Sequence, residues 1–192
     1  MRNSRSMKRL TLLAFAGLLA ACDESSVVGP PNAAAPAVLT DAPVPPSILS
    51  PAGWGPVRIG TTEAKAIEAM GGGRATEPVL GSTCHYVRPL SSGSIRVMIE
   101  NGKVSRIEAH GGADHVVTDT GLSLGATPDQ VRARYSGELD EEPDKYLPAP
   151  AATLTWWNRR ENIGIRYLVN SAGLVDAIFV GGSSIRNVEG CS

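Results

Sequence analysis

The sequence has no apolar run long enough to cross a membrane as a helix, and it has no excess of positive charge. Its apolar stretch at residues 10–21 has twelve residues, whereas a spanning helix needs about 20. Residues 1–9 hold four of the 18 Lys and Arg, so 14 remain against 19 Asp and Glu. No basic patch is visible, which argues against a nucleic-acid partner.

Residues 1–21 have the layout of a secretory signal, with a charged start, a short apolar stretch and small residues before a cleavage point. The run Leu19-Ala20-Ala21-Cys22 resembles a bacterial lipobox. The resemblance implies acylation of the Cys22 thiol, cleavage after Ala21, and a lipid anchor in a bacterial cell envelope, with the protein facing the periplasm. A plain secretory signal with an incidental Cys22 is the alternative, and Asp23 leaves the choice of inner or outer membrane open.

Cysteine is scarce, with three residues in the chain. If Cys22 carries lipid, Cys84 and Cys191 remain in a compartment that permits disulfides, and we expect them to pair. Two free thiols are the alternative. A catalytic pair of Cys84 with His85 is less favoured, because neighbours in a strand point to opposite faces.

The composition divides the chain into three parts. Residues 1–21 are the expected signal peptide, and residues 22–52 are rich in Pro and Ala and are typical of an extended tether. Residues 53–192 carry the hydrophobic patterning of a folded domain. Within this domain, residues 55–62 are echoed by residues 120–127, each copy a short strand, a Gly and a Thr that can cap a helix.

The elements expected in the two copies are alike. A helix begins at Thr62 in the first copy, and one begins at Thr127 in the second, where Pro128 and Gln130 complete an N-terminal signature. Each helix is followed by antiparallel strands, with a hairpin turn predicted at Asn101-Gly102. We therefore expect an α+β fold of two tandem helix-plus-antiparallel-hairpin repeats, at about 53–112 and 118–182, sharing a sheet with both helices on one face. Residues 183–192 would be a C-terminal tail.

The motifs Ile59-Gly60-Thr61-Thr62 and Leu124-Gly125-Ala126-Thr127-Pro128 carry a resemblance that covers about residues 53–182. The paired units look like the β-lactamase-inhibitor-protein-like fold, and they are similar to the small lipoproteins of the outer-membrane assembly machinery. The resemblance implies binding of other proteins through the sheet face and loops, with no active site. The chain departs from the assembly lipoproteins in having two units where they have one.

Three features could suggest chemistry, and each has a simpler interpretation. A metal site needs three or four ligands that converge. His110, Asp114 and His115 lie on the segment between the two repeats, where a polar linker is the simpler interpretation. The glycines at 71–73 follow a helix and lack the Lys-Ser/Thr of a phosphate-binding loop. The acidic residues at 140–144 lie among prolines and suit a solvated loop. We expect no catalytic residues, no metal and no cofactor.

The expected sheet has one face turned away from the helices, and that face is our candidate binding surface. Arg and Trp side chains are enriched at protein interfaces. The alternative is a solvated face with scattered apolar residues. The candidate residues are Arg96, Met98, Trp156, Trp157 and Arg166, with one of the two adjacent Trp on each face.

Together these patterns predict a membrane-anchored cell-envelope lipoprotein that binds another envelope protein and is not an enzyme. An inhibitor or immunity protein against an extracytoplasmic hydrolase is a narrower alternative. A further alternative is an envelope hydrolase or small-ligand binder that uses His85, His110 or His115.

Overall fold

The computed structural model describes residues 47–78, 80–136 and 138–191. The expected signal, Cys22 and residues 23–46 of the expected tether lie outside these ranges. Across the described part of the chain, no helix has both the length and the apolar character needed to cross a membrane.

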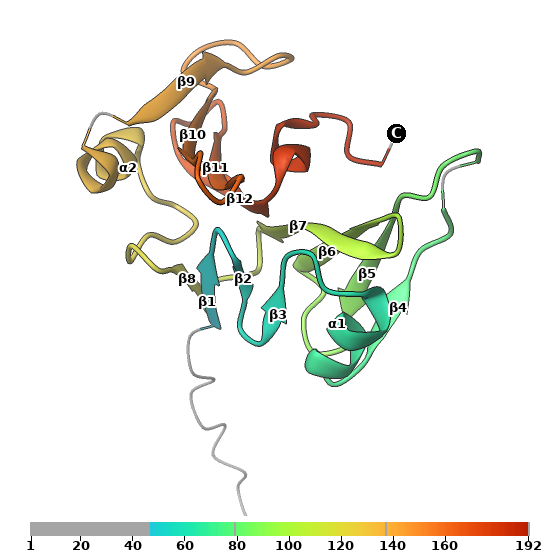
Figure 1. Ribbon diagram of the computed structural model, residues 1–192. Helices are drawn as coiled ribbons and strands as arrows, with labels where there is room; N and C mark the ends of the chain where they lie inside the picture. The colour runs from blue at the N-terminus through green and yellow to red at the C-terminus, as the bar shows by residue number, and fades with distance from the viewer. Residues whose placement is uncertain (1–46, 79, 137, 192) are drawn as a thin grey trace, which may run out of the picture. The chain divides into compact units, whose positions relative to one another are not determined.

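The fold is mostly β, and the expected α+β fold of two tandem repeats is wrong. Strands account for 42% of the described residues against 13% for helices, and they form one four-stranded and one eight-stranded sheet (Figure 1). The described strands are β1 (Ser47–Ser50), β2 (Gly53–Trp54), β3 (Val57–Arg58), β4 (Gly73–Ala75), β5 (His85–Pro89), β6 (Ile95–Glu100), β7 (Lys103–His110), β8 (Val116–Thr118), β9 (Leu139–Pro143), β10 (Ala152–Asn158), β11 (Ile163–Val169) and β12 (Val175–Gly181).

Short strands explain the error. The four-stranded sheet runs in the order β3-β2-β1-β8, and its members have only two to four residues. So few positions cannot show the alternation that identifies a strand in a sequence. Strand β1 lies inside the Pro-rich stretch at 22–52 that we assigned to a tether, and it pairs in parallel with β8.

The eight-stranded sheet runs in the order β4-β5-β6-β7-β12-β11-β10-β9. Each strand is antiparallel to its neighbours, and the central pair β7–β12 joins segments that are far apart in the sequence. The predicted hairpin at Asn101-Gly102 is confirmed between β6 and β7, where both residues have positive φ, 51° and 71°. This is the backbone geometry that an Asn-Gly turn favours.

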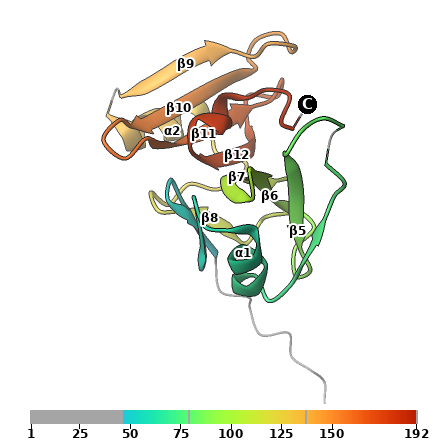
Figure 2. The ribbon, with the colours of Figure 1, turned by 45° about the vertical axis from the view of Figure 1, so that its right-hand side comes forward.

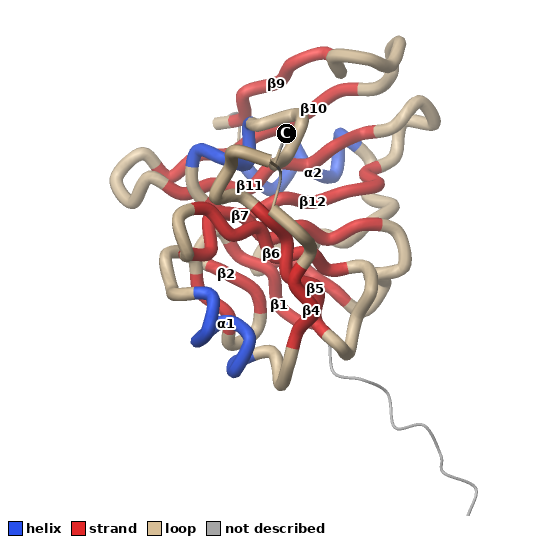
Figure 3. Tube along the Cα trace, turned by 90° about the vertical axis from the view of Figure 1, so that its right-hand side faces the viewer, coloured by secondary structure: helices blue, strands red, loops and turns tan. Residues whose placement is uncertain are grey.

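The described residues form two α-helices, α1 (Glu63–Ala69) and α2 (Pro128–Tyr135), shown in blue in Figure 3. The predicted start of α2 is confirmed: Thr127 accepts a hydrogen bond from the Gln130 backbone N–H, and the Gln130 side chain accepts one from the Thr127 backbone N–H. At α1 the Thr62 side chain makes no capping hydrogen bond.

One main core lies between the two sheets and the helices. The eight-stranded sheet contributes Val97, Ile107, Ile165 and Ile178 among others, while α2 contributes Val131. Burying each such aliphatic side chain stabilises the fold by about 1.5–3 kcal/mol. The face of the eight-stranded sheet that points away from this core is called the outer face below.

Candidate binding face of the eight-stranded sheet

The outer face is built by strand alternation on the central strands. On β7 the residues Ile107 and Ala109 enter the main core, which turns Arg106, Glu108 and His110 to the other side. The neighbouring strands place Arg96 and Phe179 directly opposite Glu108.

A C-terminal strap, residues 182–191, lies across this face (Figure 2). It begins with the short 3-10 helix η1 (Ser183–Arg186), and Ile185 of this helix is buried against Ala177 and Phe179. The predicted disulfide is confirmed: Cys84 of the loop before β5 is bonded to Cys191 at the far end of the strap. The strap is thus attached to the sheet covalently.

Backbone irregularities create the attachment points of the strap. The β6–β7 pairing shifts register after Met98, so Ser105 is left out of the ladder. The Ser105 carbonyl then accepts hydrogen bonds from the Gly182 N–H, at 3.1 Å, and from the Ser184 hydroxyl, at 3.0 Å. Gly181 has a φ of 143°, and a Cβ there would lie 2.3 Å from the Ser105 carbonyl oxygen, so this close approach requires glycine.

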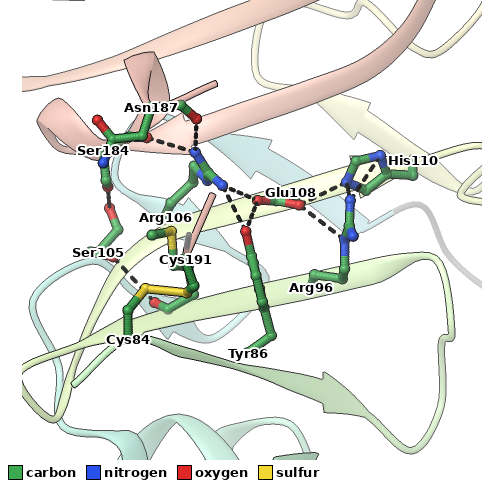
Figure 4. A network of polar contacts seen from close by, with 11 residues as sticks. Cys84, Tyr86, Arg96, Ser105, Arg106, Glu108, His110, Ser184, Asn187 and Cys191 are labelled. Carbon is green, nitrogen blue, oxygen red and sulfur yellow. Dashed lines mark hydrogen bonds and ion pairs between the residues drawn. A yellow bond between two sulfur atoms is a disulfide. The ribbon is translucent and has the colours of Figure 1, made fainter. Parts of the chain in front are cut away.

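Arg106 ties the strap to the sheet through its side chain (Figure 4). Its guanidinium is 2% exposed, and it donates to the carbonyl oxygens of Ser184 at 2.7 Å and Asn187 at 2.8 Å. A third bond reaches the Tyr86 hydroxyl at 2.8 Å. The guanidinium carbon of Arg106 lies over the Phe179 ring, 4.8 Å from the ring centroid.

Glu108 supplies the negative charge for this cluster. It is 1% exposed and accepts hydrogen bonds from the Tyr86 hydroxyl at 3.0 Å and from His110 Nε2 at 2.8 Å. It also forms ion pairs with Arg106 and with Arg96. Burial alone would raise the pKa of Glu108, but the His110 hydrogen bond and the two guanidinium charges hold it below its ordinary value. Glu108 is therefore an ionised carboxylate with both oxygens occupied by donors.

An outer groove opens beside the strap, with a cavity volume of about 360 Å³. Arg166, which is 7% exposed, lies at its floor and donates to Thr153 at 2.9 Å. Leu168 and Phe179 add apolar surface to the floor, and the walls come from the β9–β10 connection on one side and the strap on the other.

The rim of the outer groove carries exposed apolar and aromatic side chains. Val188 lines the groove and is 53% exposed. Tyr146 and Leu147 directly follow the lining residue Lys145 in the chain and are 62% and 47% exposed. The Tyr146 hydroxyl donates a hydrogen bond to Glu189 of the strap. Farther along the outer face, Arg186 lies over the Trp157 ring at 5.8 Å.

The structure brings four of the five predicted binding residues to the outer face. Arg96, Met98, Trp157 and Arg166 lie there, whereas Trp156 packs against the main core. The expectation that this face is open is wrong at its centre, because the strap covers it. Met98 is 0% exposed beside the disulfide, so it cannot contact a partner directly.

The three His residues do not converge. His85 faces Glu63 of α1 at 3.0 Å, His110 belongs to the Glu108 cluster, and the His115 carbonyl accepts from the Ser47 N–H. No group of three or more His, Cys, Asp or Glu suited to a metal ion occurs within residues 47–78, 80–136 and 138–191.

Of the acidic residues that we assigned to a solvated loop, Asp140, Glu141 and Glu142 lie on strand β9 instead, and Asp144 follows it. Their carboxylates pair with arginines that are distant in the sequence: Asp140 with Arg186, Glu141 with Arg132, and Glu142 with Arg166. These pairs hold an exposed edge strand in place.

Sequence reasoning missed Arg106, Glu108, Phe179 and Tyr146. Alternation along residues 104–110 could have shown that Arg106, Glu108 and His110 share a face. Nothing in the sequence signals that residues 182–191 return to cover them.

Comparison with known proteins gives no relative from which a function could be transferred. The resemblance to the inhibitor-like fold and to the assembly lipoproteins therefore stays a prediction that rests on short motifs. The chain matches no protein-family model, no curated protein and no solved structure.

Proposed function

We propose that this chain is a lipid-anchored envelope protein whose outer groove binds a segment of another envelope protein. The anchor rests on residues 1–22, where charge, apolar length and the Leu19-Ala20-Ala21-Cys22 run agree. The anchoring is tested by labelling cells with a palmitate analogue: the protein should incorporate label, and the Cys22→Ser variant should not.

The observation that carries the binding proposal is the outer groove itself. Its floor combines Arg166 with the apolar side chains of Leu168 and Phe179, and the exposed side chains of Tyr146 and Val188 lie at its edge. Interfaces are enriched in Tyr, Trp and Arg, because these side chains bury large area and also offer hydrogen bonds. A volume of about 360 Å³ suits one or two apolar side chains of an extended segment.

The charges along the groove set the chemistry of that segment. Lys145 and Arg186 lie on the walls together with Glu142 and Asp144. A complementary segment carries an apolar anchor residue flanked by charges of both signs. Such complementarity contributes to specificity and to the rate of association more than to affinity.

Photo-crosslinking in cells tests this function. A photoreactive residue in place of Tyr146 or Val188 should give one discrete crosslinked product, and the same residue in place of Ile48 should not. Ile48 is a matched control, because it is also apolar and 48% exposed but lies on β1 of the other sheet. The proposal also requires that Val188→Glu abolish the Tyr146 crosslink. Equal crosslinking from all three positions would contradict it.

A further inference from the structure

A second cavity lies on the core side of the eight-stranded sheet, away from the outer groove. Its volume is about 270 Å³, and it is formed where the β1–β2 turn meets the segment after β8, the end of α2 and the β10–β11 hairpin. We call it the aromatic pocket. The side chains that matter below are Asp119, Tyr135, Trp156 and Glu161.

Two aromatic rings form one side of the aromatic pocket. The ring centroids of Tyr135 and Trp156 are 5.8 Å apart, with an angle of 31° between the ring planes. The Tyr135 hydroxyl bonds the buried Tyr167 hydroxyl at 2.8 Å and contacts the Thr120 hydroxyl at 3.4 Å, and Trp156 Nε1 donates to Glu138 at 3.4 Å. These bonds fix the rings in place before any ligand arrives.

The charges that line the aromatic pocket are all negative. Asp119 and Glu161 contribute carboxylates, and no Lys, Arg or His lines the cavity within the described residues. Neither carboxylate has an ion-pair partner among those residues. Partial burial raises the pKa of Asp119, and only backbone hydrogen bonds to Thr120 and to its own N–H counteract this.

We propose that the aromatic pocket binds a small organic cation, an ammonium or a guanidinium group. A cation over a Trp or Tyr ring is attracted by the ring quadrupole. The negative charges of the two unpaired carboxylates also attract it. An anion would meet repulsion from both carboxylates. A neutral ligand would gain apolar contacts and hydrogen bonds from the lining but no charge attraction. The volume suits a single cationic group and excludes most larger cofactors.

The cation has two sources, a free small molecule or the Lys or Arg side chain of a protein. Two probes separate them. Choline represents free quaternary ammonium compounds, and N-acetyl-arginine amide represents a side chain. The neutral control is 3,3-dimethylbutan-1-ol, which has the shape of choline without its charge.

Titrations of the purified protein carrying ¹⁵N-labelled tryptophan follow the indole N–H resonance of Trp156, assigned by its loss in Trp156→Phe. At least one cationic probe should shift this resonance saturably, and the neutral control should not. Choline alone indicates a free molecule, and the arginine amide alone indicates a partner side chain. If neither cation shifts the resonance, or if the neutral alcohol binds equally well, the proposal is wrong.

Variants at the carboxylates give the second test. Glu161→Gln and Asp119→Asn should each weaken binding of the active probe about two- to five-fold. Asp114→Asn is the matched control, an exposed Asp outside the cavity, and should leave binding unchanged. Because Glu161 is exposed and makes no described ion pair, its substitution should not affect folding. Unchanged affinity in Glu161→Gln and Asp119→Asn alike would overturn the proposal.

Discussion

At the residue scale, Glu108 has the most demanding environment in the described chain. A buried carboxylate is tolerated only when donors replace the water it has lost. Here Tyr86, Arg96, Arg106 and His110 supply them. All these partners lie on strands of the sheet, and Arg106 is also bonded to the strap. The stability of the buried carboxylate therefore depends on the outer face being intact.

Replacing Glu108 tests this dependence. Glu108→Gln should lower the free energy of unfolding by about 3–5 kcal/mol, because it leaves the buried Arg106 guanidinium without its counter-charge. Urea denaturation followed by circular dichroism measures the loss. Asp176→Asn, at an exposed position on β12 of the same sheet, is the control and should change little. Equal stability of Glu108→Gln and the wild type would contradict the assigned role.

The same carboxylate predicts a dependence of stability on pH. The pKa of Glu108 is lower in the folded state than the ordinary value of 4.5, so the folded state binds the proton less readily than the unfolded state. The stabilisation is complete above pH 4.5 and is lost as the pH falls through the lower folded-state pKa. The difference in unfolding free energy between wild type and Glu108→Gln should therefore shrink in acid, and a difference independent of pH would refute this.

At the scale of elements, local signals and long-range packing contribute separately. Helix α2 has a full capping box at Thr127, and α1 has only backbone contacts at Thr62. Both are too short to be stable in isolation, so the sheet must support them. The strap has little regular structure, and its position depends on the disulfide and on Arg106.

The two helix starts form a matched pair of sites. Thr127→Ala should destabilise the protein by about 0.5–2 kcal/mol, because a backbone N–H loses its acceptor. Thr62→Ala should cost clearly less, since that side chain caps nothing. Thermal or urea unfolding of both variants measures the contrast, and equal losses would show that the Thr127 cap has no energetic role.

Opening the disulfide should release the strap. Cys84→Ser with Cys191→Ser should lower stability by about 2–5 kcal/mol, since the bond closes a long loop in the unfolded chain. It should also speed hydrogen exchange at Ile185 and Asn187, whose N–H groups bond within the strap. Exchange in the α2 helix provides the internal control. Unchanged protection of Ile185 would mean that the noncovalent contacts with Arg106 and Ser105 hold the strap without the disulfide.

At the scale of the whole molecule, the pairing of β7 with β12 makes the halves of residues 47–191 interdependent. Val97 of one half and Ile165 of the other belong to the same core, as do Leu49 and Trp54 of the small sheet. A continuous core of this kind favours one cooperative unfolding transition.

A core substitution at the centre tests that cooperativity. Ile178→Ala on β12 should cost about 2–5 kcal/mol, because it removes buried volume at a position with 1% exposure. Tryptophan fluorescence and far-ultraviolet circular dichroism should shift together. If the two signals separate, the sheets unfold independently and the single-core description is wrong.

The predictions made from sequence succeeded where a signal is local. Asn101-Gly102 specified a hairpin, and Thr127, Pro128 and Gln130 specified a helix start. The pairing of Cys84 with Cys191 was predicted from the even number of cysteines left beside Cys22 and from the expected oxidising compartment. The short strands β1 and β9 were missed, because the Pro-rich and acidic composition around them is typical of linkers and solvated loops.

The amino-acid order by itself determined turns, caps and the alternation that puts Arg96, Trp157 and Arg166 on one face. Only the tertiary structure decided which of those side chains remain accessible. The strap, the outer groove and the aromatic pocket all depend on contacts between residues far apart in the chain. Local patterns set the direction in which a side chain points, whereas its partners and exposure depend on which distant segments pack over it.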